Sequence, residues 1–232
     1  MHGALGFGFP MLSTPILTLV YDLKTAILLT LLPSLVIIIV SLLNCSDVKK
    51  WLLEFRLIIG TTTAGSFLGS CVLVWADPDI LKIVLACTIL IVLFSSKIKL
   101  FSTFLNKYPI FFALIMGGLA GVVGGATNAI APILMIYLLE VTKSAKQVIV
   151  VSNICFLLGK LMQATVLSSQ YSMGEVLNPE VLLVFTIAII GLFVGIKLQS
   201  KIDEKSYHVL IKNILVLFMI ALVYQGSGDF FI

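Results

Sequence analysis

Charged residues are scarce in this chain. Only 11% of its 232 residues are Asp, Glu, Lys or Arg, whereas 60% are hydrophobic; a soluble domain is about a quarter charged and about half apolar. The mean hydropathy is +1.17, and a water-soluble fold of this size has too much surface to cover with so few polar groups. The composition therefore excludes an ordinary soluble domain and indicates an integral membrane protein.

Metal-ligating and catalytic residue types are also sparse. His2 and His208 are the only histidines, and the four cysteines include no C-x-x-C pair, so neither a zinc site nor a redox pair is indicated. The motifs H-E-x-x-H and G-x-S-x-G are absent. We therefore expect no enzyme, no catalytic residue, no metal and no cofactor.

The net charge of +4 does not indicate a nucleic-acid partner, because the basic residues form no stripe with interleaved aromatic residues. They lie instead in short loops between apolar runs, where they determine topology. Each apolar run is a candidate membrane segment, since a helix needs about 20 apolar residues to cross the bilayer. The candidates are residues 26–43, 57–75, 80–94, 108–139, 148–167, 181–198 and 209–224.

The stretch 108–139 differs from the other segments because it is too long for one straight crossing. Its middle, residues 124–132, reads Gly-Gly-Ala-Thr-Asn-Ala-Ile-Ala-Pro, and Gly, Asn and Pro are poor helix formers. We therefore predict two half-helices joined by an unwound segment.

The chain also repeats itself. Gly8 and Gly125 each lie seven residues before the Pro of a Pro-Ile-Leu sequence, and each copy continues to Lys-Thr-Ala or Lys-Ser-Ala. Internal repeats are common in transporters. We predict a single membrane domain of two repeats, residues 1–106 and 107–232. Because Met1 aligns with Gly118, residues 108–117 have no counterpart in the first copy, and we expect the N-terminus to be truncated.

Basic residues alternate between the predicted loops. The loops near residues 50, 100 and 200 carry Lys or Arg, whereas those holding Asp77 and Glu175 carry none. Basic loops face the cytoplasm. If 108–139 is re-entrant, every Lys-rich loop lies on that side and the repeats are inverted; a kinked full span remains the alternative. We predict an all-α polytopic membrane protein of two inverted repeats, each a broken or re-entrant helix plus about three transmembrane helices.

The broken stretches are the predicted binding site. Unwound backbone inside a membrane is tolerated only where it is buried in protein or lines a wet cavity. Half-helices beginning near Pro132 and Pro10 would present free N–H groups and the positive end of a helix dipole near the bilayer midplane, which binds an anion. The predicted substrate-binding residues are Gly8, Pro10, Ser34, Gly124, Gly125, Thr127, Asn128, Asn153 and Lys160.

Each of these residues also has a structural interpretation. The predicted site glycines would also allow two helices to pack closely. The glycine pairs 65/69 and 117/121 have the small-xxx-small spacing that is typical of such packing. Thr127 and Asn128 suit helix capping, and Ser34 and Asn153 suit hydrogen bonds between helices. Lys160 lies deep in an apolar segment, which favours a functional role, but its long side chain also permits snorkelling to the interface. We expect Gly125→Leu to abolish transport and leave the protein folded.

The two Gly/Pro repeats resemble the sulfite exporter TauE/SafE family of membrane permeases, also called TSUP. The resemblance rests on Gly6-Phe-Gly8 with Pro10 and Pro15, and on Gly121-Val-Val-Gly124-Gly125 with Pro132. The duplicated layout extends it over nearly the whole chain.

This resemblance implies a multi-pass protein of the bacterial inner membrane that moves sulfite, an organosulfonate or a related small anion. Its partners would be that anion and the lipid bilayer, with a homo-oligomer also compatible. Phe7 and Phe9 depart from the more Gly-rich first motif of the family. The alternative is therefore a non-transporting accessory subunit or an inactive, truncated paralogue.

Overall fold

The computed structural model describes residues 9–43, 45, 47–95, 108–142 and 144–170, with positions 179, 181–187, 189, 190, 216 and 220. This part of the chain is helical and contains no strand, which confirms the all-α class. Most of the predicted segment 209–224 and half of 181–198 lie outside the described residues. The helices are α2 (Phe9–Leu17), α3 (Leu23–Leu43), α4 (Val48–Glu54), α5 (Arg56–Trp75), α6 (Pro78–Ser95), α8 (Pro109–Thr127), α9 (Ala131–Val141) and α10 (Ala145–Leu167).

Four of these helices, α3, α5, α8 and α10, are long and apolar enough to cross a membrane. Together with α6, they confirm the predicted segments 26–43, 57–75, 80–94 and 148–167 to within one helical turn. The signals that ended each segment were a charge, a Pro or an Asn, and helices end at such residues in water. The structure is therefore that of a multi-pass membrane protein.

Helices α5 and α8 form the tightest contact in the bundle. Gly117 of α8 lies against Ile58 of α5, and Gly125 of α8 lies against Ser66 of α5. Each contact moves two turns toward the C-terminus on both helices, so the two helices run parallel. Between these contacts, Gly121 meets the backbone of α5 at residues 62–66, and a side chain there would overlap the Thr62 carbonyl oxygen. The small-residue spacing thus brings the two backbones into direct contact, as predicted for these glycines.

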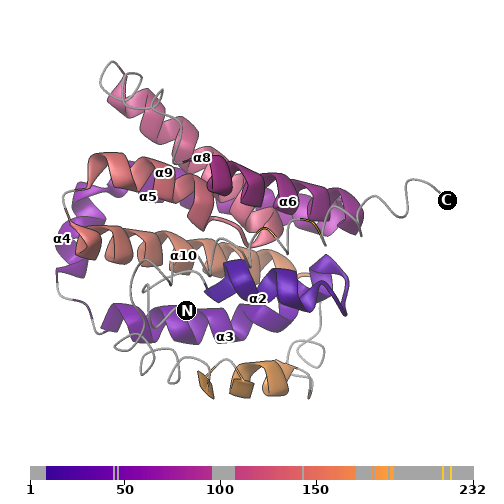
Figure 1. Ribbon diagram of the computed structural model, residues 1–232. Coiled ribbons are helices and arrows are strands. Elements are labelled where there is room, and N and C mark those ends of the chain that lie inside the picture. The colour runs from indigo at the N-terminus through magenta and orange to yellow at the C-terminus, as the bar shows by residue number, and fades with distance from the viewer. Residues whose placement is uncertain are drawn as a thin grey trace.

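Helix α9 turns back along α8. Phe112, in the first turn of α8, packs against Tyr137 near the end of α9, with ring centroids 5.8 Å apart. Helix α10 follows at once, and the Nζ of Lys146 in its first turn lies 5.8 Å from the ring of Trp51 in α4. Because Gly117, in the middle of α8, lies against Ile58 near the start of α5, and α4 directly precedes α5, the first half of α8 and the end of α9 lie at the α4 end of the bundle (Figure 1). Helices α8 and α9 therefore form a hairpin, and that this hairpin is re-entrant in the membrane stays a prediction.

The break inside this hairpin is shorter than the sequence predicted. Helix α8 continues through Gly124 and Gly125 to Thr127, and only residues 128–130 separate it from α9. The prediction that the two glycines are unwound was wrong. They remain helical because their missing side chains allow close packing, Gly125 on α5 and Gly124 on the side chain of Ile130.

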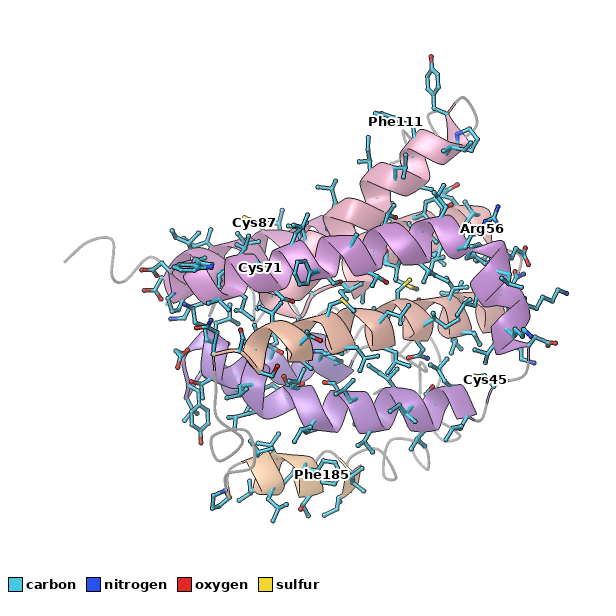
Figure 2. The ribbon with its side chains drawn as sticks, turned by 180° about the vertical axis from the view of Figure 1, so that it is seen from behind. Cys45, Arg56, Cys71, Cys87, Phe111 and Phe185 are labelled. Carbon is cyan, nitrogen blue, oxygen red and sulfur yellow. The ribbon has the colours of Figure 1, made fainter. Side chains whose placement is uncertain are left out.

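Both ends of the bundle carry charges of both signs. Lys49, Lys50, Arg56 and Lys146 lie at the α4 end with Asp47, Glu54 and Glu140 (Figure 1), while Asp22, Asp77 and Asp79 lie near the start of α3 and α6 at the other end, with Lys24 and Lys82. Figure 2 shows α5 running from Arg56 beside α4 to Cys71 near the opposite end, with α10 alongside it. That the α4 end faces the cytoplasm stays a prediction.

Candidate functional site

A small cavity lies where the α8–α9 break meets α2 and α10. Its volume is about 20 Å³, which is room for roughly one water molecule. Five of the predicted site residues line it, and five further residues complete the wall. The lining residues are Pro10, Gly124, Gly125, Asn128 and Lys160, with Ile130, Ala131, Phe156, Gly159 and Gln163.

Lys160 projects into the bundle and does not snorkel. Its side chain is only 4% exposed, and its Nζ donates to Asn128 Oδ1 at 2.5 Å and to Gln163 Oε1 at 2.6 Å. Both acceptors are neutral amides. Within the described ranges the one salt bridge is elsewhere, between Lys82 and Asp79, so no described carboxylate balances the Lys160 charge. An ammonium group has three donors, and these two bonds use two of them.

Asn128 connects the break to the first half of the chain. It is the C-cap of α8 in the left-handed conformation, with φ 67°, and its N–H donates to Gly124 O at 2.8 Å. Its Nδ2 donates to Thr14 Oγ1 of α2 at 2.9 Å and to Thr30 Oγ1 of α3 at 3.1 Å. These partners orient the amide, because its oxygen is thereby left to accept from Lys160. Asn tolerates a left-handed backbone better than most residues.

Gln163 completes the polar network on α10. Its Nε2 donates to Gly125 O at 2.9 Å. The last four carbonyls of a helix have no partner within that helix, so Gln163 satisfies one that α8 leaves open. A continuous chain of hydrogen bonds therefore runs from Gly125 through Gln163, Lys160 and Asn128 to α2 and α3.

The start of α9 faces the same cavity. The first i→i−4 hydrogen bond of this helix runs from Leu134 N to Ile130 O at 3.2 Å, so the amides of Ala131 and Ile133 precede it. Pro132, between them, has no N–H. No side chain caps α9. Because Ile130 and Ala131 line the cavity, the positive end of the α9 dipole is directed at it.

Comparison with protein families shows which family the chain belongs to. Residues 1–225 match the family described as Sulfite exporter TauE/SafE. The chain belongs to this family. Neither the comparison with curated proteins nor that with solved structures gives a match. Membership of the TauE/SafE family implies a membrane transporter of sulfur anions, since the family consists of permeases and not of enzymes. The resemblance inferred from the two Gly/Pro repeats is thereby confirmed.

Three further predicted residues of this TauE/SafE protein, Ser34, Thr127 and Asn153, are not among the residues that line the cavity. Thr127 Oγ1 donates to Val123 O at 2.7 Å and Ser34 Oγ to Thr30 O at 2.5 Å, each within its own helix. Asn153 Nδ2 donates to Ser41 Oγ at 3.2 Å, which ties α10 to α3. Gly8 lies outside the described residues. For Asn153 the geometry matches the predicted hydrogen bond between helices, whereas Thr127 and Ser34 make bonds within their own helices that are neither the predicted cap nor a bond between helices.

Sequence reasoning omitted half of the wall of this TauE/SafE cavity. Phe156 and Gln163 stand at positions i−4 and i+3 relative to Lys160, so helical spacing from the buried cation was the signal that could have found them; Gly159, at i−1, lacked that signal. Ile130 and Ala131 carried no such signal, because an apolar residue beside a break has the same pattern as one that faces lipid.

Proposed function

We propose that this chain is a multi-pass permease of the bacterial inner membrane that moves a small sulfur oxyanion, sulfite or an organosulfonate, bound between Lys160 and the start of α9. One observation carries the proposal: among the described residues, a lysine buried in a membrane-length helix is hydrogen-bonded only to neutral amides. A buried charge is costly unless it is paired. An anion in the adjoining cavity supplies the missing countercharge.

The backbone supports the same assignment. The N-terminal amides of a helix and the positive end of its dipole attract anions without a charged side chain. Here that end belongs to α9 and lines the same cavity as Lys160. The amides belong to α9 and Lys160 belongs to α10. A bound anion would therefore connect these two helices.

Transport requires the cavity wall to move. A space of about 20 Å³ is too small for a sulfite ion, since it holds roughly one water molecule. The bonds from Asn128 to Thr14 and Thr30 join the α8–α9 hairpin to α2 and α3. We infer that residues 1–106 and 107–232 are inverted repeats, and that motion of one against the other opens the cavity to each side in turn.

The test is uptake by purified protein in liposomes. Wild-type protein should take up radiolabelled sulfite or an organosulfonate, and Lys160→Gln should reduce uptake at least about a hundredfold, because it removes the only described cation at the site. Glutamine keeps a donor for the Asn128 and Gln163 oxygens, so the variant should still elute as a single species. Lys82→Gln, which removes a lysine paired with Asp79 at the end of the bundle, is the matched control.

Two outcomes would contradict the proposal. Absence of uptake of sulfite, thiosulfate and organosulfonates by wild-type protein would exclude the permease, and a stable co-purifying partner would then favour the accessory subunit. Uptake by Lys160→Gln equal to that of Lys82→Gln would exclude the site.

A further inference from the structure

Ser66, in the middle of α5, has a hydroxyl group without a partner. The residue is fully buried, and its Oγ forms no hydrogen bond in the described part of the chain. Buried polar groups in proteins are nearly always hydrogen-bonded, and an exception calls for an explanation such as a bound molecule. The hydroxyl of Ser66 is such an exception inside a membrane-length helix.

Three other hydroxyl groups on α5 behave differently, whereas Thr62 Oγ1 is buried without a hydrogen-bond partner in the described part of the chain, like Ser66 Oγ. Thr61, Thr63 and Ser70 each donate to a carbonyl oxygen four residues earlier in the same helix, at 2.9, 2.8 and 2.7 Å. This is the usual way for a helix to satisfy Ser and Thr. Ser66 is as deeply buried as Ser70, one turn away, yet it does not make the usual bond.

The Ser66 hydroxyl adjoins the cavity. A Cβ atom at Gly159 would lie 2.9 Å from Ser66 Oγ and 3.1 Å from Ile130 Cδ1. Gly159 and Ile130 both line the cavity that holds Lys160. Because Gly159 has no side chain, no Cβ atom stands there between the cavity and the Ser66 hydroxyl.

We propose that Ser66 is a further substrate-binding residue, whose hydroxyl donates to an oxygen of the bound anion past the bare Cα of Gly159. The proposal rests on the permease function above and deepens it. Lys160 binds the anion from α10, the amides of α9 from the break, and Ser66 from α5. Donors on three helices can each bind a different oxygen of an oxyanion such as sulfite, and we expect the site to prefer such an ion to a monatomic halide.

The discriminating experiment compares Ser66→Ala with Ser70→Ala in the liposome assay. Ser66→Ala removes a hydroxyl that makes no bond within the protein, so it should fold normally and raise the KM for radiolabelled sulfite about tenfold, as expected for one hydrogen bond to a charged ligand. Ser70→Ala removes an equally buried hydroxyl that is satisfied within α5, and its KM should equal that of wild type.

Glycine substitutions give an independent readout. Gly159→Ala places a methyl group between the cavity and the Ser66 hydroxyl, and uptake should be lost. Gly118→Ala introduces the same methyl group where no other atom lies within 4 Å, and uptake should be retained. Unlabelled thiosulfate should compete with sulfite, and excess chloride should not.

The outcomes separate this inference from the permease proposal. If wild-type protein transports sulfite and Lys160→Gln does not, but Ser66→Ala has the wild-type KM, the role of Ser66 is overturned and the permease stands. If chloride competes as well as thiosulfate, the selection of oxyanions is overturned. If wild-type protein transports no sulfur anion, both proposals fail together.

Discussion

The α5–α8 interface and the α8–α9 break use glycine for different purposes. At the interface, Gly121 brings two backbones together and leaves no space between them. At the break, Gly124 makes room for the side chain of Ile130 beside a cavity lined by Asn128 and Lys160. The comparison teaches that tight backbone packing holds the helices in place, while the polar groups that such packing cannot satisfy gather where the helix is interrupted.

Gly125 belongs to both regions. A Cβ atom there would overlap the Ser66 carbonyl oxygen, and its own carbonyl accepts a hydrogen bond from Gln163. This geometry revises the expectation drawn from the sequence for Gly125→Leu. We now expect that substitution to disrupt the α5–α8 interface, and any loss of transport would then follow from loss of fold.

The largest effect should come from breaking the interface itself. In Gly121→Ala the new methyl group meets the Thr62 carbonyl oxygen and the Ser66 amide. Overpacking costs about 1–3 kcal/mol, and rigid backbone atoms place it at the upper end, which corresponds to a loss of about 10 °C in thermal midpoint. Gly118→Ala, on the same helix but facing open space, should match wild type in a thermal-shift assay. Equal midpoints for the two variants would show that the interface is not tightly packed.

A smaller effect is expected at the break, where the backbone and the side chain of Asn128 can be tested separately. Asn128→Gly keeps the left-handed backbone but loses the bonds to Lys160, Thr14 and Thr30, so sulfite uptake should fall at least about tenfold. Asn128→Ala loses the same bonds and adds about 1 kcal/mol of backbone strain, so its midpoint should lie about 3 °C below that of Asn128→Gly. Wild-type uptake by Asn128→Gly would remove this residue from the site.

The smallest effect should come from a polar cap outside the membrane segment. Asp22 accepts hydrogen bonds from the backbone amides of Lys24 and Thr25 at 2.9 and 3.1 Å and from the Thr25 hydroxyl. Burial raises the pKa of Asp22, but these hydrogen bonds outweigh it and hold the pKa below the ordinary 3.8. Asp22→Ala should cost about 1 kcal/mol at neutral pH, as loss of an N-cap does.

The pH dependence checks this last prediction. A lowered pKa means that the carboxylate stabilises the fold above the ordinary pKa and that this contribution disappears as the pH falls through the lowered value. The thermal midpoints of wild type and Asp22→Ala should therefore differ by a few degrees at pH 7 and converge in acid. A constant difference down to the lowest pH would show that ionised Asp22 is not the cap.

Much of the fold was predictable because the membrane imposes strict length and composition rules. Helices α3, α5, α6 and α10 could be located from apolar runs and the charges that bound them. The wall of the cavity was only partly predictable. Lys160 was found because a lysine in an apolar segment is unusual, whereas Ala131 became part of the site only through the return of α9 beside α8.

The sequence by itself determined that the chain is a helical membrane protein with a broken segment near Asn128, because apolar length and the backbone preferences of Gly, Asn and Pro are local properties. The tertiary structure decided which groups meet at that break. Ser66, Gly159 and Lys160 come from two helices distant in sequence, and only helix packing sets the distance between a hydroxyl group, an ammonium group and the start of α9.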